Sequence, residues 1–308
     1  MTRTILITGS TGFIGKNIVE GFKDKYTLLT PTHKELDVLN QNDVRDYFRN
    51  HDIDIIIHCA NAGGTRKSHL PPGRVLEQNT RMFFNLAENQ DRYHRLINLG
   101  SGAEYNKYRP LIKVSETEFG KSIPPEDYGF SKYLVSKHIE KTCNMYSLRL
   151  FGIFGKYEDY EYKFISNAIV KNLFHLPITI RQNVKFSWVY IDDFLKILDT
   201  FLSTTPHYPL YNITLSPPID LITIAQTINA VSGYESEIIT ENDGLNFEYS
   251  GDNTRLKEYI KGIQYTSLES AIKELIGYYS SILPTIDRNA IERDVYAAQC
   301  NVIKRWIK

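Results

Sequence analysis

Neither sign of charge is in excess in this sequence, because 36 lysines and arginines balance 36 aspartates and glutamates. Binding to nucleic acid or to an anionic membrane surface is therefore not indicated, since both require a basic excess. Apolar runs of the roughly 20 residues that cross a bilayer are also missing. The chain enters a strand-like apolar stretch at residue 4, which leaves no room for a signal peptide. We expect a cytoplasmic protein with no membrane partner.

Cysteine is scarce and scattered. Cys59, Cys143 and Cys300 lie far apart and show no metal-ligand spacing, so we expect reduced thiols and no metal site. Internal repeats, low-complexity segments and an obvious linker are absent as well. A chain of 308 residues is long for one domain and short for two independent ones. These features favour one large unit with a smaller region appended.

The first half of the chain contains a regular alternation of apolar strands and helices. Strand-like runs cover residues 4–9, 26–30, 54–60, 95–101 and 145–152, with helical patterns between them. Continuous apolar strands separated by helices predict a parallel sheet covered on both faces, with right-handed crossovers. The fold class is therefore α/β, a Rossmann-like doubly wound parallel sheet whose ligands bind at the carboxyl ends of the strands.

A glycine-rich loop joins the first strand to the first helix. Its sequence, TGSTGFIG, places Gly9, Gly12 and Gly15 in a G-x-x-G-x-x-G spacing. Such glycines provide a tight turn, a close approach to a pyrophosphate and close helix–strand packing. The loop predicts a dinucleotide site. Its contacts are expected from Gly9, Ser10, Thr11, Gly12, Phe13, Ile14 and Gly15.

The alternation of strands and helices becomes irregular after residue 152, and the expected domain organisation is based on this change. We assign residues 1–165 to the dinucleotide-binding domain, with 184–205 returning to it. Residues 166–183 and 206–280 are expected to form a smaller C-terminal α/β substrate-binding region. Residues 281–308 are amphipathic and predict a C-terminal helical tail.

The choice between NADP and NAD depends on the residues that follow the second strand. An acid there binds the ribose 2′-hydroxyl of NAD and repels a 2′-phosphate. This stretch has no acid before Glu35, whereas His33 and Lys34 can accept a phosphate. We therefore expect NADP as the cofactor, with NAD as the second choice.

The stretch EDYGFSKYLVSK contains Tyr-x-x-x-Lys twice, as Tyr128 with Lys132 and as Tyr133 with Lys137. Residues four apart share a face of a helix, whereas residues five apart lie about 140° round it, so only one pair can face the cofactor. The face of Tyr128 continues as an apolar stripe, and the face of Tyr133 continues through polar residues. Tyr128 and Lys132 are therefore the predicted catalytic pair. A lysine cation one helical turn away is expected to lower the tyrosine pKa and favour proton transfer.

These motifs together resemble the extended short-chain dehydrogenase/reductases, the NAD(P)-dependent epimerase/dehydratase family. KELDVLN, CANAGG, LGS, YGFSK and VYIDD occur in the order typical of GDP-fucose synthases and nucleotide-sugar 4-ketoreductases. The resemblance implies that Ser101, in LGSGAEY, completes a triad with Tyr128 and Lys132, and that Lys132 also binds the nicotinamide ribose. It implies further cofactor contacts from Asp37, Val38, Ala60, Asn61, Ala62, Asn79, Leu99 and Phe151. It implies substrate contacts from Gly63, Ser101, Gly102, Lys163 and Lys185.

The residues after Ser101 narrow the reaction that the resemblance implies. Sugar 4,6-dehydratases carry Asp-Glu there, where this chain has Gly102 and Ala103. GDP-fucose synthases have a cysteine at the position of Ala103 and a histidine at the position of Phe164. Because this chain has neither, 3,5-epimerisation is not indicated either. The remaining triad suffices for hydride transfer at one carbon. We expect an NAD(P)-dependent reductase of a 4-keto nucleotide sugar. A C4 epimerase with tightly bound NAD and a non-catalytic dinucleotide-binding regulator are the alternatives.

The substrate side departs from the family pattern at three positions. Relatives have a phosphate-binding arginine where this chain has Phe186, and an asparagine where it has Gly152. Tyr249 begins the segment YSGD, where relatives have an R-P-G-D-like segment. The helical patterns over 74–90 and 128–143 correspond to the pair that relatives use in a two-fold four-helix interface. The resemblance therefore also implies a homodimer.

Overall fold

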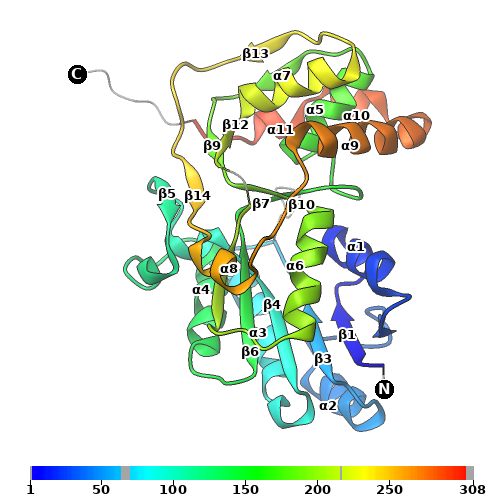
Figure 1. The fold of residues 1–308 in the computed structure, drawn as a ribbon, viewed down its shortest axis with the longest axis vertical. Coiled ribbons are helices and arrows are strands. Elements are labelled where there is room, and N and C mark those ends of the chain that lie inside the picture. Colours follow the sequence, from blue (N-terminus) through cyan, green and yellow to red (C-terminus); the bar gives the residue numbers. More distant parts are fainter. Residues whose placement is uncertain (1, 64–69, 216, 303–308) are drawn as a thin grey trace.

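The computed structural model describes residues 2–63, 70–215 and 217–302, and its centre is a six-stranded parallel sheet (Figure 1). The strands lie in the order β11-β6-β4-β3-β1-β2. They are β1 Thr4–Thr8, β2 Thr27–Leu29, β3 Ile55–His58, β4 Arg95–Ser101, β6 Met145–Leu150 and β11 Leu210–Ile213. The chain changes direction across the sheet between β1 and β3, and this switch point is where such sheets bind ligands.

Helices cover both faces of the sheet. Helices α1 Phe13–Phe22 and α6 Ile191–Ser203 lie on one face, and α2 Gln41–Asn50, α3 Arg74–Ala87 and α4 Asp127–Ile139 lie on the other. The alternating side chains of β1 fix this arrangement, because Ile5 and Ile7 pack with the first layer while Leu6 packs with the second. All five residues of β1 are apolar or threonine and four are buried, as expected for a strand covered twice.

The second part of the molecule lies above the first in Figure 1 and is built around packed helices. These are α5 Phe164–Leu173, α7 Leu221–Ser232 and α9 Leu268–Ile282. Three small sheets accompany them: β8 Ile178–Ile180 with β13 Ile238–Thr240; β7 Gly152–Phe154 with β10 Trp188–Tyr190; and β12 Ile219–Asp220, β9 Lys185–Phe186, β14 Tyr249–Gly251 and β5 Leu111–Val114. The other helices are α8 Thr254–Tyr259, α10 Arg288–Glu292, α11 Val295–Ala298 and the 3-10 turns η1 Gln90–Arg92, η2 Gly102–Tyr105, η3 Glu116–Glu118 and η4 Leu283–Thr285.

The predicted fold class is confirmed, while the expected domain limits need correction at two places. Strand β11 pairs with β6 in the main sheet, although residues 206–280 were expected to belong wholly to the substrate-binding region. Strand β5, from the expected dinucleotide-binding domain, pairs with β14 in the four-stranded sheet. Tertiary packing decides which strand a short strand pairs with, and the local sequence pattern does not indicate the partner. The division of function between the two parts remains a prediction.

The tail is helical but interrupted. Helices α10 and α11 are separated by Asp294, whose φ of 47° is left-handed, so a single amphipathic helix does not form. Residues 303–308 of the predicted tail lie outside the described residues. Within residues 2–63, 70–215 and 217–302, no helix is long and apolar enough to cross a membrane.

Candidate active site

The glycine-rich loop lies between β1 and α1, close to the chain that leaves β3. Gly9 has a φ of 66°, and a Cβ there would lie 2.7 Å from Ala60 N. A Cβ at Gly15 would collide with the backbone of Gly9, so both positions require glycine. Helix α1 begins after Gly12 without a side-chain cap, which leaves its first backbone N–H groups for a ligand. This cradle fits the pyrophosphate of a dinucleotide.

The Asn79 side chain forms hydrogen bonds both with the loop that follows β3 and with helix α4. Its side-chain oxygen accepts from Ala62 N at 2.7 Å, and its Nδ2 donates to Ala62 O at 3.0 Å and to Ser131 Oγ at 3.3 Å. The side chain is only 4% exposed. The predicted cofactor contacts Ala60, Asn61 and Ala62 are therefore on a loop that Asn79 holds in place.

Other predicted cofactor and substrate positions lie at the same edge of the sheet. Gly63 has a φ of 66° and packs against Val75 of α3. The Asp37 carboxylate accepts from Leu39 N at 2.9 Å, and Val38 O accepts from Asn85 Nδ2 at 2.9 Å. Both contacts shape the segment between β2 and α2.

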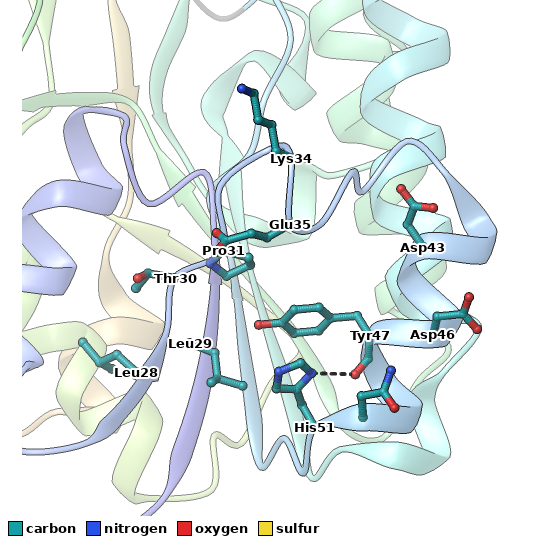
Figure 2. A pocket seen from close by; sticks show the side chains of 11 residues that line it. Leu28, Leu29, Thr30, Pro31, Lys34, Glu35, Asp43, Asp46, Tyr47 and His51 are labelled. Atoms are coloured by element: carbon teal, nitrogen blue, oxygen red, sulfur yellow. Dashed lines mark hydrogen bonds between the residues drawn. The ribbon is translucent and has the colours of Figure 1, made fainter.

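The residues after β2 include His33 and Lys34, which were predicted to bind a 2′-phosphate. His33 is exposed, and its Nδ1 lies 3.5 Å from Asp37 Oδ1. The Glu35 carboxylate accepts from Thr32 N at 2.7 Å, and this hydrogen bond stabilises the turn over residues 32–35. Lys34 lines a pocket of about 760 Å³ between β2 and α2, and Figure 2 shows its side chain pointing away from Tyr47 and His51.

Ser101, Tyr128 and Lys132 converge at the carboxyl end of β4. Lys132 Nζ donates to Leu99 O at 2.9 Å and lies 5.8 Å from the centre of the Tyr128 ring. The Ser101 side chain accepts from Ala103 N at 3.2 Å, and Ser101 lies close enough to Tyr128 to act on its pKa. Ser131, Lys132, Val135 and Ile139 are buried along this face of α4, as the helical periodicity predicts.

Tyr133 and Lys137 lie on the flank of the same helix. Lys137 forms an ion pair with Glu140 at 2.8 Å, and its Nζ lies 4.5 Å from the centre of the Phe119 ring. Both side chains are half-buried and belong to a separate surface of the molecule. The second Tyr-x-x-x-Lys pair is therefore turned away from Ser101.

The electrostatics of the pair differ from expectation. Burial raises the pKa of Tyr128 to about 12, while Ser101 acts against this rise and Glu104 and Glu126 act with it. Burial also lowers the pKa of Lys132 to about 8, which Glu104 partly opposes. The expected lowering of the Tyr128 pKa is thus wrong for this arrangement, because burial outweighs the influence that lowers this pKa. Tyr128 is protonated at neutral pH.

Sequence reasoning missed a buried ion pair directly behind Ser101. Glu104 Oε1 accepts from Ser101 N at 3.0 Å, and Arg149 Nε donates to Glu104 Oε2 at 2.6 Å, with both side chains fully buried. Arg149 Nη1 also donates to Tyr105 Oη at 2.8 Å. Ser101 and Glu104 form a capping box, and their S-x-x-E spacing is the sequence signal that could have indicated the contact between them. The pair holds the backbone that carries the catalytic serine.

A cation beside Tyr128 was missed as well. Lys107 Nζ lies 5.9 Å from the centre of the Tyr128 ring and 3.1 Å from Glu126 Oε1. Tyr128 therefore has one ammonium group on its own helix and another on the loop after η2. Lys107 is exposed, so this second cation stands at the mouth of the site.

Aromatic rings cover the substrate side of Ser101. The Phe151 ring lies 5.1 Å from that of Tyr249, and a Cβ on Gly102 would lie 2.6 Å from Phe151 Cδ1. Lys185 is exposed on β9 beside Phe186, and Lys163 precedes α5. Burial raises the pKa of Glu158 to about 7, and Lys163 partly opposes this rise. The predicted substrate contacts of the two lysines remain predictions.

Comparison with known proteins identifies the family. A sequence profile described as the NAD dependent epimerase/dehydratase family matches residues 5–214, which is more than half of the chain. The chain belongs to this family. Its membership confirms the resemblance drawn from the motifs, and the protein is an NAD(P)-dependent enzyme of the oxidoreductase and epimerase type.

Individual relatives extend the match over nearly the whole chain. A GDP-L-colitose synthase of Yersinia pseudotuberculosis is 26% identical, over 89% of this chain and 97% of its own. A GDP-L-fucose synthetase from Naegleria fowleri, solved with NADP, superimposes with a TM-score of 0.81 at 17% identity, covering 92% of this chain and 96% of its own. A GDP-mannoheptose C4 reductase from Campylobacter jejuni, also with NADP, gives 0.73 at 16% identity, covering 91% and 98%. The structural matches share the fold of this family member.

Proposed function

We propose that the protein uses NADPH to reduce the 4-keto group of a nucleotide-linked sugar. The observation that carries the proposal is the convergence of Ser101, Lys132 and a protonated Tyr128 at the end of β4, followed by Gly102 and Ala103, which have no acid or base in their side chains. A reductase needs a proton donor at one oxygen, and a protonated phenol supplies it. A dehydratase or a 3,5-epimerase would need additional acids and bases beside the sugar ring.

The chain's own residues account for the proton transfer. When bound, the reduced nicotinamide supplies the hydride that the keto carbon accepts. Ser101 Oγ holds the carbonyl oxygen, and Tyr128 Oη donates its proton to that oxygen. Lys132, fixed by Leu99 O, holds the nicotinamide ribose and stabilises the phenolate that Tyr128 becomes. Tyr128 then regains a proton from water.

The proposed cofactor and substrate class draw on local chemistry and on relatives. The Glu35 carboxylate accepts from Thr32 N, whereas His33 and Lys34 follow β2 and can donate to a 2′-phosphate, which favours NADP. Two of the superimposable structures hold NADP, and three relatives named above act on GDP-linked sugars. A GDP-linked 4-keto sugar is therefore the first substrate to test.

The test is NADPH consumption, followed by absorbance at the nicotinamide band, with purified protein and a GDP-linked 4-keto sugar. We expect stoichiometric oxidation of NADPH and a product reduced at C4. Co-purified NAD together with no net consumption of NADPH would contradict the proposal and indicate a C4 epimerase instead. NADPH binding without any turnover would point to the regulator.

A further inference from the structure

A buried serine of helix α4 contacts the backbone of Tyr128. Ser131 stands between Tyr128 and Lys132 in the motif YGFSK, and its side chain is fully buried. Its Oγ donates to Tyr128 O at 2.7 Å and accepts from Asn79 Nδ2 at 3.3 Å. Tyr128 belongs to the first turn of α4, where the N-cap residue Glu126 forms no side-chain cap hydrogen bond. Ser131 therefore restrains a turn that has no capping side chain.

The backbone of Ala62 fixes the direction of the hydrogen bonds in this network. Its N–H can only donate, so the Asn79 side-chain oxygen must face it, at 2.7 Å. The Asn79 amide nitrogen then donates to Ala62 O at 3.0 Å and to Ser131 Oγ. Because that nitrogen cannot accept, the Ser131 hydroxyl keeps its own proton for Tyr128 O. Each group thus donates to the next, from Asn79 through Ser131 to Tyr128.

The other end of the network lies beside the predicted pyrophosphate cradle. Ala62 is on the loop after β3, which also carries Ala60, and both are predicted cofactor contacts. A Cβ on Gly9 would lie 2.7 Å from Ala60 N, so this loop and the glycine-rich loop are in close contact. A ligand that orders the loop after β3 therefore acts on Tyr128 through Asn79, even when the ligand does not reach α4.

We propose that Ser131 is a positioning residue, which transmits occupancy of the cofactor loop to the backbone of Tyr128. The role rests on the proposed proton donation by Tyr128 to the keto oxygen. Ser131 contributes no group to the reaction itself, because it acts through the Tyr128 carbonyl on one side and through Asn79 on the other. A cofactor bound at the loop restrains the turn that carries the phenol, which is the geometry that proton transfer requires.

The test uses a cofactor fragment that reaches the loop but lacks the part expected at Lys132. This fragment is 2′-phospho-ADP, which is NADP without its nicotinamide riboside; ADP takes its place if the protein binds NAD. In hydrogen exchange followed by mass spectrometry, we expect the fragment to protect residues 9–15 and to slow exchange in residues 127–133 by about fivefold, as one hydrogen bond does. Ser131→Ala should keep the first effect and lose the second.

Two results would overturn the proposal. One is equal protection of residues 127–133 in wild type and in Ser131→Ala. The other is a wild-type protein in which either fragment protects residues 9–15 alone. Protection of neither segment by either fragment would refute the dinucleotide site on which the link depends.

Ser136→Ala is the matched control. Ser136 is also a fully buried serine of α4, but its Oγ donates to Ser147 Oγ on β6, at 3.2 Å, and not to the backbone of Tyr128. This variant should retain wild-type protection of both segments, and loss of protection in residues 127–133 would contradict the specific role of Ser131. If Ser131→Ala fails to fold, Asn79→Ala breaks the link at its other end and should lose the same protection.

Kinetics separate this role from the proposed reaction. If the protein is a reductase, Ser131→Ala should lower kcat by about tenfold with little change in KM for NADPH, because Tyr128 is misplaced while the cofactor still binds. Ser136→Ala should change neither constant by more than about twofold. An unchanged kcat in Ser131→Ala would contradict the proposal. A wild-type enzyme without reductase activity would refute the proposed function, while the exchange experiment would still decide the role of Ser131.

Discussion

Tyr128 and Lys132 share one face of α4, and burial acts on both so as to favour their neutral forms. The pKa of Tyr128 rises to about 12 and that of Lys132 falls to about 8. At neutral pH the tyrosine is therefore a proton donor, while the lysine is still largely a cation. This combination suits reduction of a carbonyl better than abstraction of a proton from an alcohol.

The two tyrosines of the repeated motif provide a matched comparison. We expect Tyr128→Phe to lower kcat by about 10²–10⁴-fold, because it removes the proton donor. Tyr133→Phe should leave kcat within about twofold of wild type, since its ring lies on the Phe119 side of the helix. Steady-state NADPH oxidation measures both. Equal losses in the two variants would contradict the assignment of Tyr128.

Lys132 gives the reaction a pH dependence. Its folded pKa of about 8 lies below the ordinary lysine value, so the ammonium is present below pH 8 and is lost as pH rises through it. We expect kcat/KM for NADPH to fall with rising pH around 8. Lys132→Arg should be less active but should lack this fall, because a guanidinium keeps its proton. An identical pH profile in the two proteins would exclude Lys132 as its origin.

At the scale of elements, the Glu104–Arg149 pair links η2 to β6 beneath the active site. Both side chains are fully buried, so removing one partner leaves an uncompensated charge in the core. We expect Glu104→Gln to lower the free energy of unfolding by about 3–5 kcal/mol, measured by urea denaturation. Asp46→Asn, in the exposed Asp46–Arg49 pair, should change it by less than about 1 kcal/mol. A loss of under 1 kcal/mol in Glu104→Gln would contradict this view.

Elements with strong local patterns could be predicted from the sequence. The run RLINLGS forms β4 over Arg95–Ser101, and the glycine spacing places α1 directly after the turn. The position of the Tyr249 hydroxyl beside Gly102 could not be predicted, because it depends on β14 pairing with β5, far away in the sequence. The Tyr128 pKa was mispredicted for a similar reason, since burial is set by tertiary packing that helical spacing does not report.

At the scale of the whole molecule, the outer faces of α3 and α4 lie side by side and carry an exposed ring. Phe84 is 40% exposed and its ring lies 5.1 Å from that of His138, across the two helices. We propose a homodimer through this face, and expect Phe84→Glu to give a monomer in light scattering coupled to size-exclusion chromatography. Tyr265→Glu, at a site 46% exposed elsewhere, should leave the wild-type mass unchanged. A monomeric wild-type protein would refute the dimer.

The exchange of strands between the two parts constrains how such a protein can be rearranged. Strand β11 lies at one edge of the main sheet although the chain has already passed through α5, and β5 leaves the first part to pair with β14. A cut near residue 165 would therefore leave each fragment with a missing neighbour in its sheet. The two halves are not interchangeable modules, and a chimaera with another family member would have to exchange these strands together.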